Sequence, residues 1–145
     1  DLAEGETWYH RALDANPNYA YPMVRLGDLS EARGDLAEAE TWYHRALDTN
    51  PNSTYAMANL GDLSQARGDL AEGETWYHRA LDANPNYAYP MVRLGDLSEA
   101  RGDLAEAETW YHRALDTNPN SNRAYILSRL DRMREKRGEL DDAEI

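Results

Sequence analysis

Four histidines recur along the chain at one fixed spacing, and histidine is a common metal ligand and proton carrier. They are His10, His44, His78 and His112. On equivalent positions of packed helices, neighbouring imidazoles would lie ~10 Å apart, which is the packing distance of helices. A single zinc ion needs every ligand at ~2 Å, and no second histidine follows at position i+4. The pattern therefore predicts a solvated helix surface, with no metal site and no cofactor.

Other residues that could bind a metal, bind a phosphate or act in catalysis also lack the partner residues that such a site would need. The segment from Asp14 to Asn18 looks like the opening of a calcium loop, but Tyr19 stands where glycine is required and Arg25 where glutamate is required. The chain has no cysteine, and its glycines stand singly, so neither a thiolate site nor a phosphate-binding loop is expected. Three serines recur mid-helix without a candidate base: Ser30, Ser64 and Ser98. We therefore expect that the protein is not an enzyme.

The net charge narrows the class of partner. The chain of 145 residues carries a formal charge of −12, which repels phosphate backbones and anionic membranes. No apolar run approaches the ~18 residues that cross a membrane, and no signal peptide opens the chain. The sequence therefore predicts a cytoplasmic protein that binds neither nucleic acid nor membrane. Its acidic surface serves either solubility or a basic partner segment.

Internal repeats dominate the sequence. Tryptophan recurs at the same spacing as histidine, at Trp8, Trp42, Trp76 and Trp110. A second period, twice as long, lies above this one, because residues 69–120 repeat residues 1–52 without a change. Such identity predicts a very recent amplification or an engineered gene.

Each repeat unit has the pattern of two helices. In residues 20–53, Gly34 supplies a stop and Asp35 an N-cap for a second helix, which Pro51 ends. Two short helices cannot bury their apolar stripes alone, and stacking of successive pairs buries them. The stripe of the first helix consists of Met23, Leu26, Gly27 and Ser30.

The length and the pattern of the unit resemble the tetratricopeptide repeat, in which Trp-x2-Leu-Gly-x2-Tyr is followed by Ala-x3-Phe and then Pro. The first complete unit has methionine for the tryptophan and serine for the first tyrosine. The matching residues are Met23, Leu26, Gly27 and Ser30, then Ala39, Tyr43 and Pro51. The resemblance implies an all-α solenoid of stacked antiparallel helix hairpins that winds into a right-handed superhelix.

We expect one array over residues 1–145. The basic last segment would hold a first helix and the start of a second. The divisions are a second helix of a half repeat at 1–19, whole repeats at 20–53, 54–87 and 88–121, and a divergent, truncated repeat at 122–145.

The resemblance also implies where a partner binds. In this family the first helices line a concave groove that holds peptides. The residues so placed form a tyrosine ladder beside an aspartate ladder and end on basic residues. They are Tyr21, Arg25, Asp28, Glu31, Tyr55, Asn59, Asp62, Tyr89, Arg93, Asp96, Glu99, Tyr125, Arg129 and Arg132.

One binding mode of the family fits this sequence only in part. Members that clamp the acidic tail of heat-shock chaperones use lysine and asparagine on the first groove helix, where this chain has Val24 and Asp28. Asn59 and Arg93 match the later part of that clamp. A protein or peptide of basic or aromatic character is therefore the expected partner.

Two functions remain open from the sequence. The first is a non-catalytic scaffold that binds a peptide segment in the groove. The second is a self-assembling or designed array, in which the last helices of one copy dock head-to-tail on the first helix of the next. The identical units favour symmetry or extension, whereas a groove adapted to one partner would have diversified.

Overall fold

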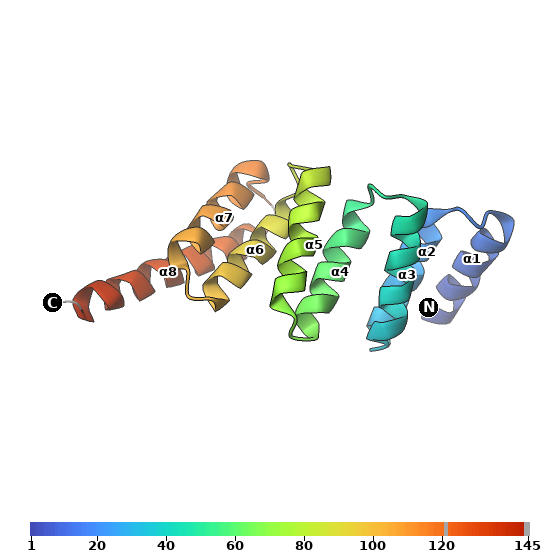
Figure 1. The fold of residues 1–145 in the computed structure, drawn as a ribbon, viewed down its shortest axis with the longest axis horizontal. Coiled ribbons are helices and arrows are strands. Elements are labelled where there is room, and N and C mark those ends of the chain that lie inside the picture. The colour runs from blue at the N-terminus through green and yellow to red at the C-terminus, as the bar shows by residue number, and fades with distance from the viewer. Residues whose placement is uncertain (121, 144–145) are drawn as a thin grey trace. The chain divides into compact units, whose positions relative to one another are not determined.

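The computed structural model describes residues 1–120 and 122–143, with side chains up to residue 139, and contains helices as its only regular elements there (Figure 1). The chain divides into two compact units, residues 1–83 with five helices and residues 84–145 with three. The helices are α1 (Leu2–Ala15), α2 (Ala20–Ala32), α3 (Leu36–Thr49), α4 (Thr54–Ala66), α5 (Leu70–Ala83), α6 (Ala88–Ala100), α7 (Leu104–Thr117) and α8 (Arg123–Ala143). The predicted all-α fold of stacked helix hairpins is confirmed, and the right-handed superhelix stays a prediction.

Tight glycine turns join the two helices of each hairpin. Gly34 between α2 and α3 has a φ of +81°, a left-handed conformation that glycine adopts without steric cost. Gly68 and Gly102 repeat it in the α4–α5 and α6–α7 hairpins, with φ of +86° and +82°. The next residue then caps the second helix: the Asp35 carboxylate accepts a hydrogen bond from the Glu38 amide at 3.1 Å. This local chemistry reverses the chain within three residues.

The core of each hairpin is a tyrosine ring seated on a glycine. The rings of Tyr43, Tyr77 and Tyr111 are 0% exposed and lie against the preceding first helix. A Cβ atom added at Gly61 would lie 2.6 Å from the Tyr77 ring, far inside van der Waals contact. Glycine is therefore needed there for close approach of the two helices.

The last segment differs from its expectation. A first helix followed by the start of a second was expected in residues 122–145, but α8 runs unbroken through Gly138. The glycine turn does not form there, and Glu139 occupies the place of the capping aspartate, with a side chain too long for that role. Asp131 also occupies the place of the glycine that seats a second-helix tyrosine. Residues 144–145, which were part of this prediction, lie outside the described residues.

Candidate functional site

The predicted site residues lie on the first helices of the hairpins. These are α2 and α4 in residues 1–83, and α6 and α8 in residues 84–145, and we call the surface that they form on each unit its first-helix face. Three of the tyrosines there are exposed, Tyr21 at 51%, Tyr55 at 42% and Tyr125 at 36%, whereas Tyr89 is half-buried. Their charged neighbours Arg25, Asp28 and Glu31 are half-buried. The face therefore presents aromatic rings to solvent, whereas these charged side chains are partly shielded from solvent.

Asp28 holds together three side chains from three helices. Its carboxylate accepts hydrogen bonds from the hydroxyl of Tyr43 on α3 at 2.7 Å and of Tyr55 on α4 at 3.1 Å. It also pairs with Arg25 of its own helix at 2.7 Å. Burial and the bond to Asp28 raise the pKa of Tyr43 far above its usual range, so its hydroxyl stays a donor. The aspartate therefore fixes the Tyr55 ring, and its charge is already compensated.

The same network recurs in residues 84–145. Asp96 accepts from Tyr111 at 2.6 Å and from Tyr125 at 2.8 Å, and pairs with Arg93 at 3.1 Å. In the unit of residues 1–83, Asp62 likewise accepts from the hydroxyl of Tyr77. The aspartate ladder therefore positions the tyrosines, a role that the sequence interpretation did not assign to it.

Arg25 lies between Tyr21 and Tyr55, the two tyrosines of the first-helix face in residues 1–83. Its guanidinium carbon is 5.2 Å from the centre of the Tyr21 ring and 5.5 Å from that of Tyr55, both within cation–π range. An open pocket beside these rings is lined by Ala20, Tyr21, Val24, Arg25, Asn50, Ser53 and Tyr55. The pocket has aromatic and aliphatic walls, and the Asp28 network holds two of its lining side chains, Tyr55 and Arg25.

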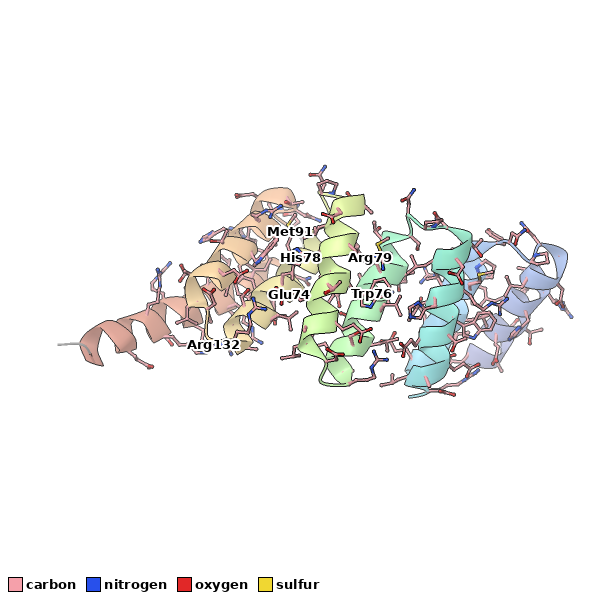
Figure 2. The ribbon with its side chains drawn as sticks, in the orientation of Figure 1. Glu74, Trp76, His78, Arg79, Met91 and Arg132 are labelled. Carbon is pink, nitrogen blue, oxygen red and sulfur yellow. The ribbon has the colours of Figure 1, made fainter. Side chains whose placement is uncertain are left out.

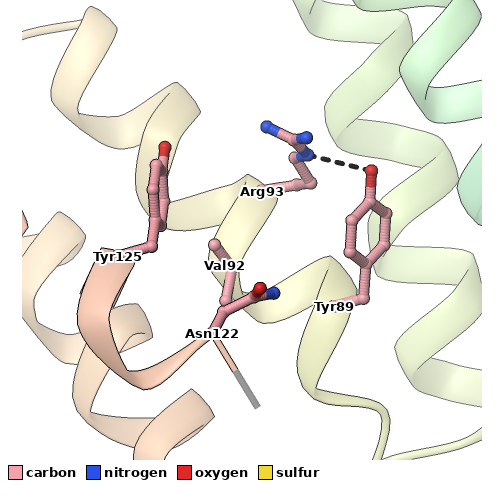
Figure 3. Close-up of a pocket in the computed structure, with 5 residues that line it drawn as sticks. All are labelled: Tyr89, Val92, Arg93, Asn122 and Tyr125. Carbon is pink, nitrogen blue, oxygen red and sulfur yellow. Dashed lines mark hydrogen bonds between the residues drawn. The ribbon is translucent and has the colours of Figure 1, made fainter.

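A second pocket lies in residues 84–145 (Figure 3). It is lined by Tyr89, Val92, Arg93, Asn122 and Tyr125, and Arg93 Nε donates to the Tyr89 hydroxyl at 3.0 Å. Both pockets combine two tyrosines, a valine and an arginine. Each unit thus offers the same kind of small, preformed contact site.

The remaining predicted residues make contacts within the protein. Asn59 donates to the Tyr55 carbonyl at 2.9 Å, and Arg129 lies 4.8 Å from the centre of the Tyr125 ring. Arg132 binds the carboxylate of Glu99. The charge of Arg132 is therefore already compensated by Glu99 of the same unit.

The sequence interpretation missed two groups of residues on this face. It named Tyr43 only as part of the repeat pattern and gave no role to Tyr77 or Tyr111, yet the hydroxyls of all three reach the aspartates 15 residues earlier. The recurrence of this Asp–Tyr spacing in every unit was the available signal. It also missed Lys136, whose position four residues after Arg132 places both cations on one side of a helix.

The histidines lie on the second helices, away from this network. Figure 2 shows Glu74 and His78 on one side of α5, with Trp76 and Arg79 on the other. His78 Nε2 is 3.9 Å from Glu74, and the Arg79 guanidinium lies 4.4 Å from the centre of the Trp76 ring. Within residues 1–120 and 122–143, no three acidic, histidine or cysteine side chains come together as a metal site, and no helix is long and apolar enough to cross a membrane.

Comparisons with known proteins agree with this geometry. The family model described as "Tetratricopeptide repeat" matches residues 1–54, 43–88 and 58–122. Among solved structures, the chain is similar to the first TPR of Spaghetti (RPAP3) bound to the HSP90 peptide SRMEEVD, with a TM-score of 0.75 and 22% identity. That match covers 82% of this chain and 95% of the other. A comparison with curated proteins gives no match. An engineered or recently amplified origin is not shown by these matches and stays a prediction.

Proposed function

The chain belongs to the tetratricopeptide repeat family, and from this premise we propose that it is a non-catalytic scaffold that binds a protein or peptide segment on its first-helix face. The observation that carries the proposal is the pair of open pockets whose tyrosine walls are held by half-buried aspartate networks. A cytoplasmic setting, compatible with the absence of cysteine, is part of this proposal.

Preorganisation is the physical reason why this face suits binding. Tyrosine offers a large, amphipathic contact area with few rotatable bonds. The ring of Tyr55 is held through its hydroxyl by Asp28, and Arg25 lies against it. A partner therefore meets side chains that are already ordered, which reduces the entropy lost on binding.

Charge separates this face from one that holds an acidic peptide. The HSP90 peptide in the similar structure, SRMEEVD, has an acidic end. This chain has Val24 and Asp28 where a clamp for such a tail has lysine and asparagine, so the cation of that clamp is replaced by an apolar residue and its amide by a carboxylate. Asp28 and Asp96 are paired with arginines, but Glu31 has no paired cation among the described residues. These features favour a segment of basic or aromatic character.

Head-to-tail assembly receives less support from the structure. If α8 docked onto α1 of a second copy, the Tyr9 ring of that α1 would have to pack against α8. In the hairpin of α2 and α3, the Tyr43 ring packs in this way against Gly27. Asp131 occupies the equivalent place on α8, and its side chain would meet the ring.

The test is binding of labelled peptides, measured by fluorescence anisotropy with three sets: basic, acidic, and neutral tyrosine-rich. We expect the basic or the tyrosine-rich set to bind, and Tyr21→Ala and Tyr55→Ala to weaken it severalfold. Trp8→Ala removes an aromatic ring that is at least as exposed from α1, outside the first-helix face, and is expected to leave binding unchanged. If no set binds, or if Trp8→Ala has the same effect, the proposal is wrong.

A further inference from the structure

Two equivalent glutamates of the first-helix face have opposite electrostatic surroundings. The side chain of Glu99 on α6 is 8% exposed, accepts from Arg132, and lies 3.2 Å from the Nζ atom of Lys136. Burial raises the pKa of Glu99, but the bonds from Lys136 and Arg132 outweigh this and hold it below its usual value. Glu31 on α2 has one described hydrogen bond to its carboxylate, from the Tyr43 hydroxyl at 3.0 Å. No cation pairs with Glu31 among the described residues.

The difference comes from the neighbouring helix, because α2 and α6 have the same sequence. Tyr55 of α4 donates to Asp28 in the way that Tyr125 of α8 donates to Asp96. This contact aligns the two helices and sets Asp62 of α4 in the place of Arg132 of α8. By the same alignment, Ala66 takes the place of Lys136. A carboxylate and a methyl group therefore stand where α8 supplies two cations.

Glu31 is consequently a half-buried anion beside other anions. Burial raises its pKa, the Tyr43 hydroxyl opposes this, and the charges of Asp62 and Asp28 raise it further. Ala66 is exposed, so the space that corresponds to the Lys136 side chain is open to solvent. An anion in such a position gains more from a nearby cation than a fully solvated carboxylate does.

We propose that Glu31 receives an arginine or lysine side chain of the bound peptide, which enters over Ala66 and lies beside Asp62. The partner then supplies the cation that α8 supplies to Glu99. The pocket between Tyr21 and Tyr55 lies at the other end of the same two helices, roughly 15 Å from Glu31 along α2. An aromatic or apolar residue several positions from the cation in an extended peptide therefore completes the recognised segment. This inference rests on the proposed peptide-binding function and specifies the class of peptide.

A fluorescein-labelled peptide (Gly-Arg)4 is the probe, and (Gly-Gln)4 and the tyrosine-rich set are the references. Glu31→Gln is expected to weaken (Gly-Arg)4 binding about fivefold, the effect of one partly exposed charge pair. Glu99→Gln is the matched control, because it removes the same charge from an identical helix whose glutamate is already paired. It is expected to leave the affinity within about twofold of the parent chain.

A second variant tests the site in the opposite direction. Ala66→Lys places in α4 the cation that α8 has at Lys136, so it is expected to occupy Glu31 and weaken (Gly-Arg)4 binding about fivefold or more. Equal effects of Glu31→Gln, Ala66→Lys and Glu99→Gln would show a general response to net charge and overturn the inference. Binding of the tyrosine-rich set without (Gly-Arg)4 would overturn it and leave the proposed function intact. Failure of every peptide would overturn both.

Discussion

Replacing Gly61 by alanine is expected to destabilise the α4–α5 hairpin, although alanine is the better helix former. The added Cβ would lie 2.6 Å from one ring carbon of Tyr77 and 2.9 Å from two others. Tyr77 is fully buried and its hydroxyl is bonded to Asp62, so the ring cannot turn away. Overpacking of this kind costs about 1–3 kcal/mol, whereas the gain in helix propensity is about 1 kcal/mol. The two terms together give a net loss of up to about 2 kcal/mol.

The matched control lies on the other helix of the same hairpin. Gly73→Ala adds the same methyl group, but the equivalent positions of α3 and α7 already carry Ala39 and Ala107. Its Cβ would lie 3.2 Å from the Gly61 carbonyl oxygen, a contact that small shifts relieve. We expect this variant to gain up to about 1 kcal/mol from helix propensity.

Urea unfolding followed by circular dichroism measures both variants. A difference of about 2 kcal/mol between them corresponds to roughly a 1 M separation of midpoints, at an m-value of about 2 kcal/mol/M. If Gly61→Ala is as stable as Gly73→Ala, the reasoning from the seated ring is wrong. The hairpin would then relax around a side chain at Gly61.

Three further predictions follow from named contacts. Because the folded protein raises the pKa of Tyr43 and Tyr111, a titration of absorbance at 295 nm is expected to ionise fewer than the chain's ten tyrosines before unfolding. The stability that these two groups contribute is present below the unfolded pKa of about 10 and is lost as the pH rises above it. Ionisation of all ten tyrosines in the folded state would contradict the burial of Tyr43 and Tyr111. The double variant Asp131→Gly, Arg134→Ser gives α8 the small residues that the other first helices have at these places. Its mass by light scattering is expected to grow with concentration, while the parent chain stays at 16.5 kDa. A constant mass for both proteins would show that Asp131 does not block docking. Asp35→Ala removes the cap of α3 and is expected to cost about 1 kcal/mol in urea unfolding, with an unchanged midpoint as the contrary result.

The repeat pattern predicted most of the fold because its signals are local. Gly34, Asp35 and Pro51 act on the backbone within a few residues, so their meaning can be read without knowledge of any distant contact. The same reasoning failed at Gly138, where a similar glycine lies within a continuous helix. Glycine permits a left-handed turn but does not impose it, and with Glu139 in the place of the capping aspartate no N-cap favours the start of a new helix.

The sequence by itself also determined which residues share the first-helix face, since spacings of three and four residues place side chains on one side of a helix. It could not determine how they pair. That Asp28 holds Tyr55, and that Glu99 has two cations while the equivalent Glu31 has none among the described residues, depends on residues of other helices. Electrostatic interaction falls with distance through space and is independent of distance along the chain. Two identical segments therefore became different sites only when the tertiary structure gave them different neighbours.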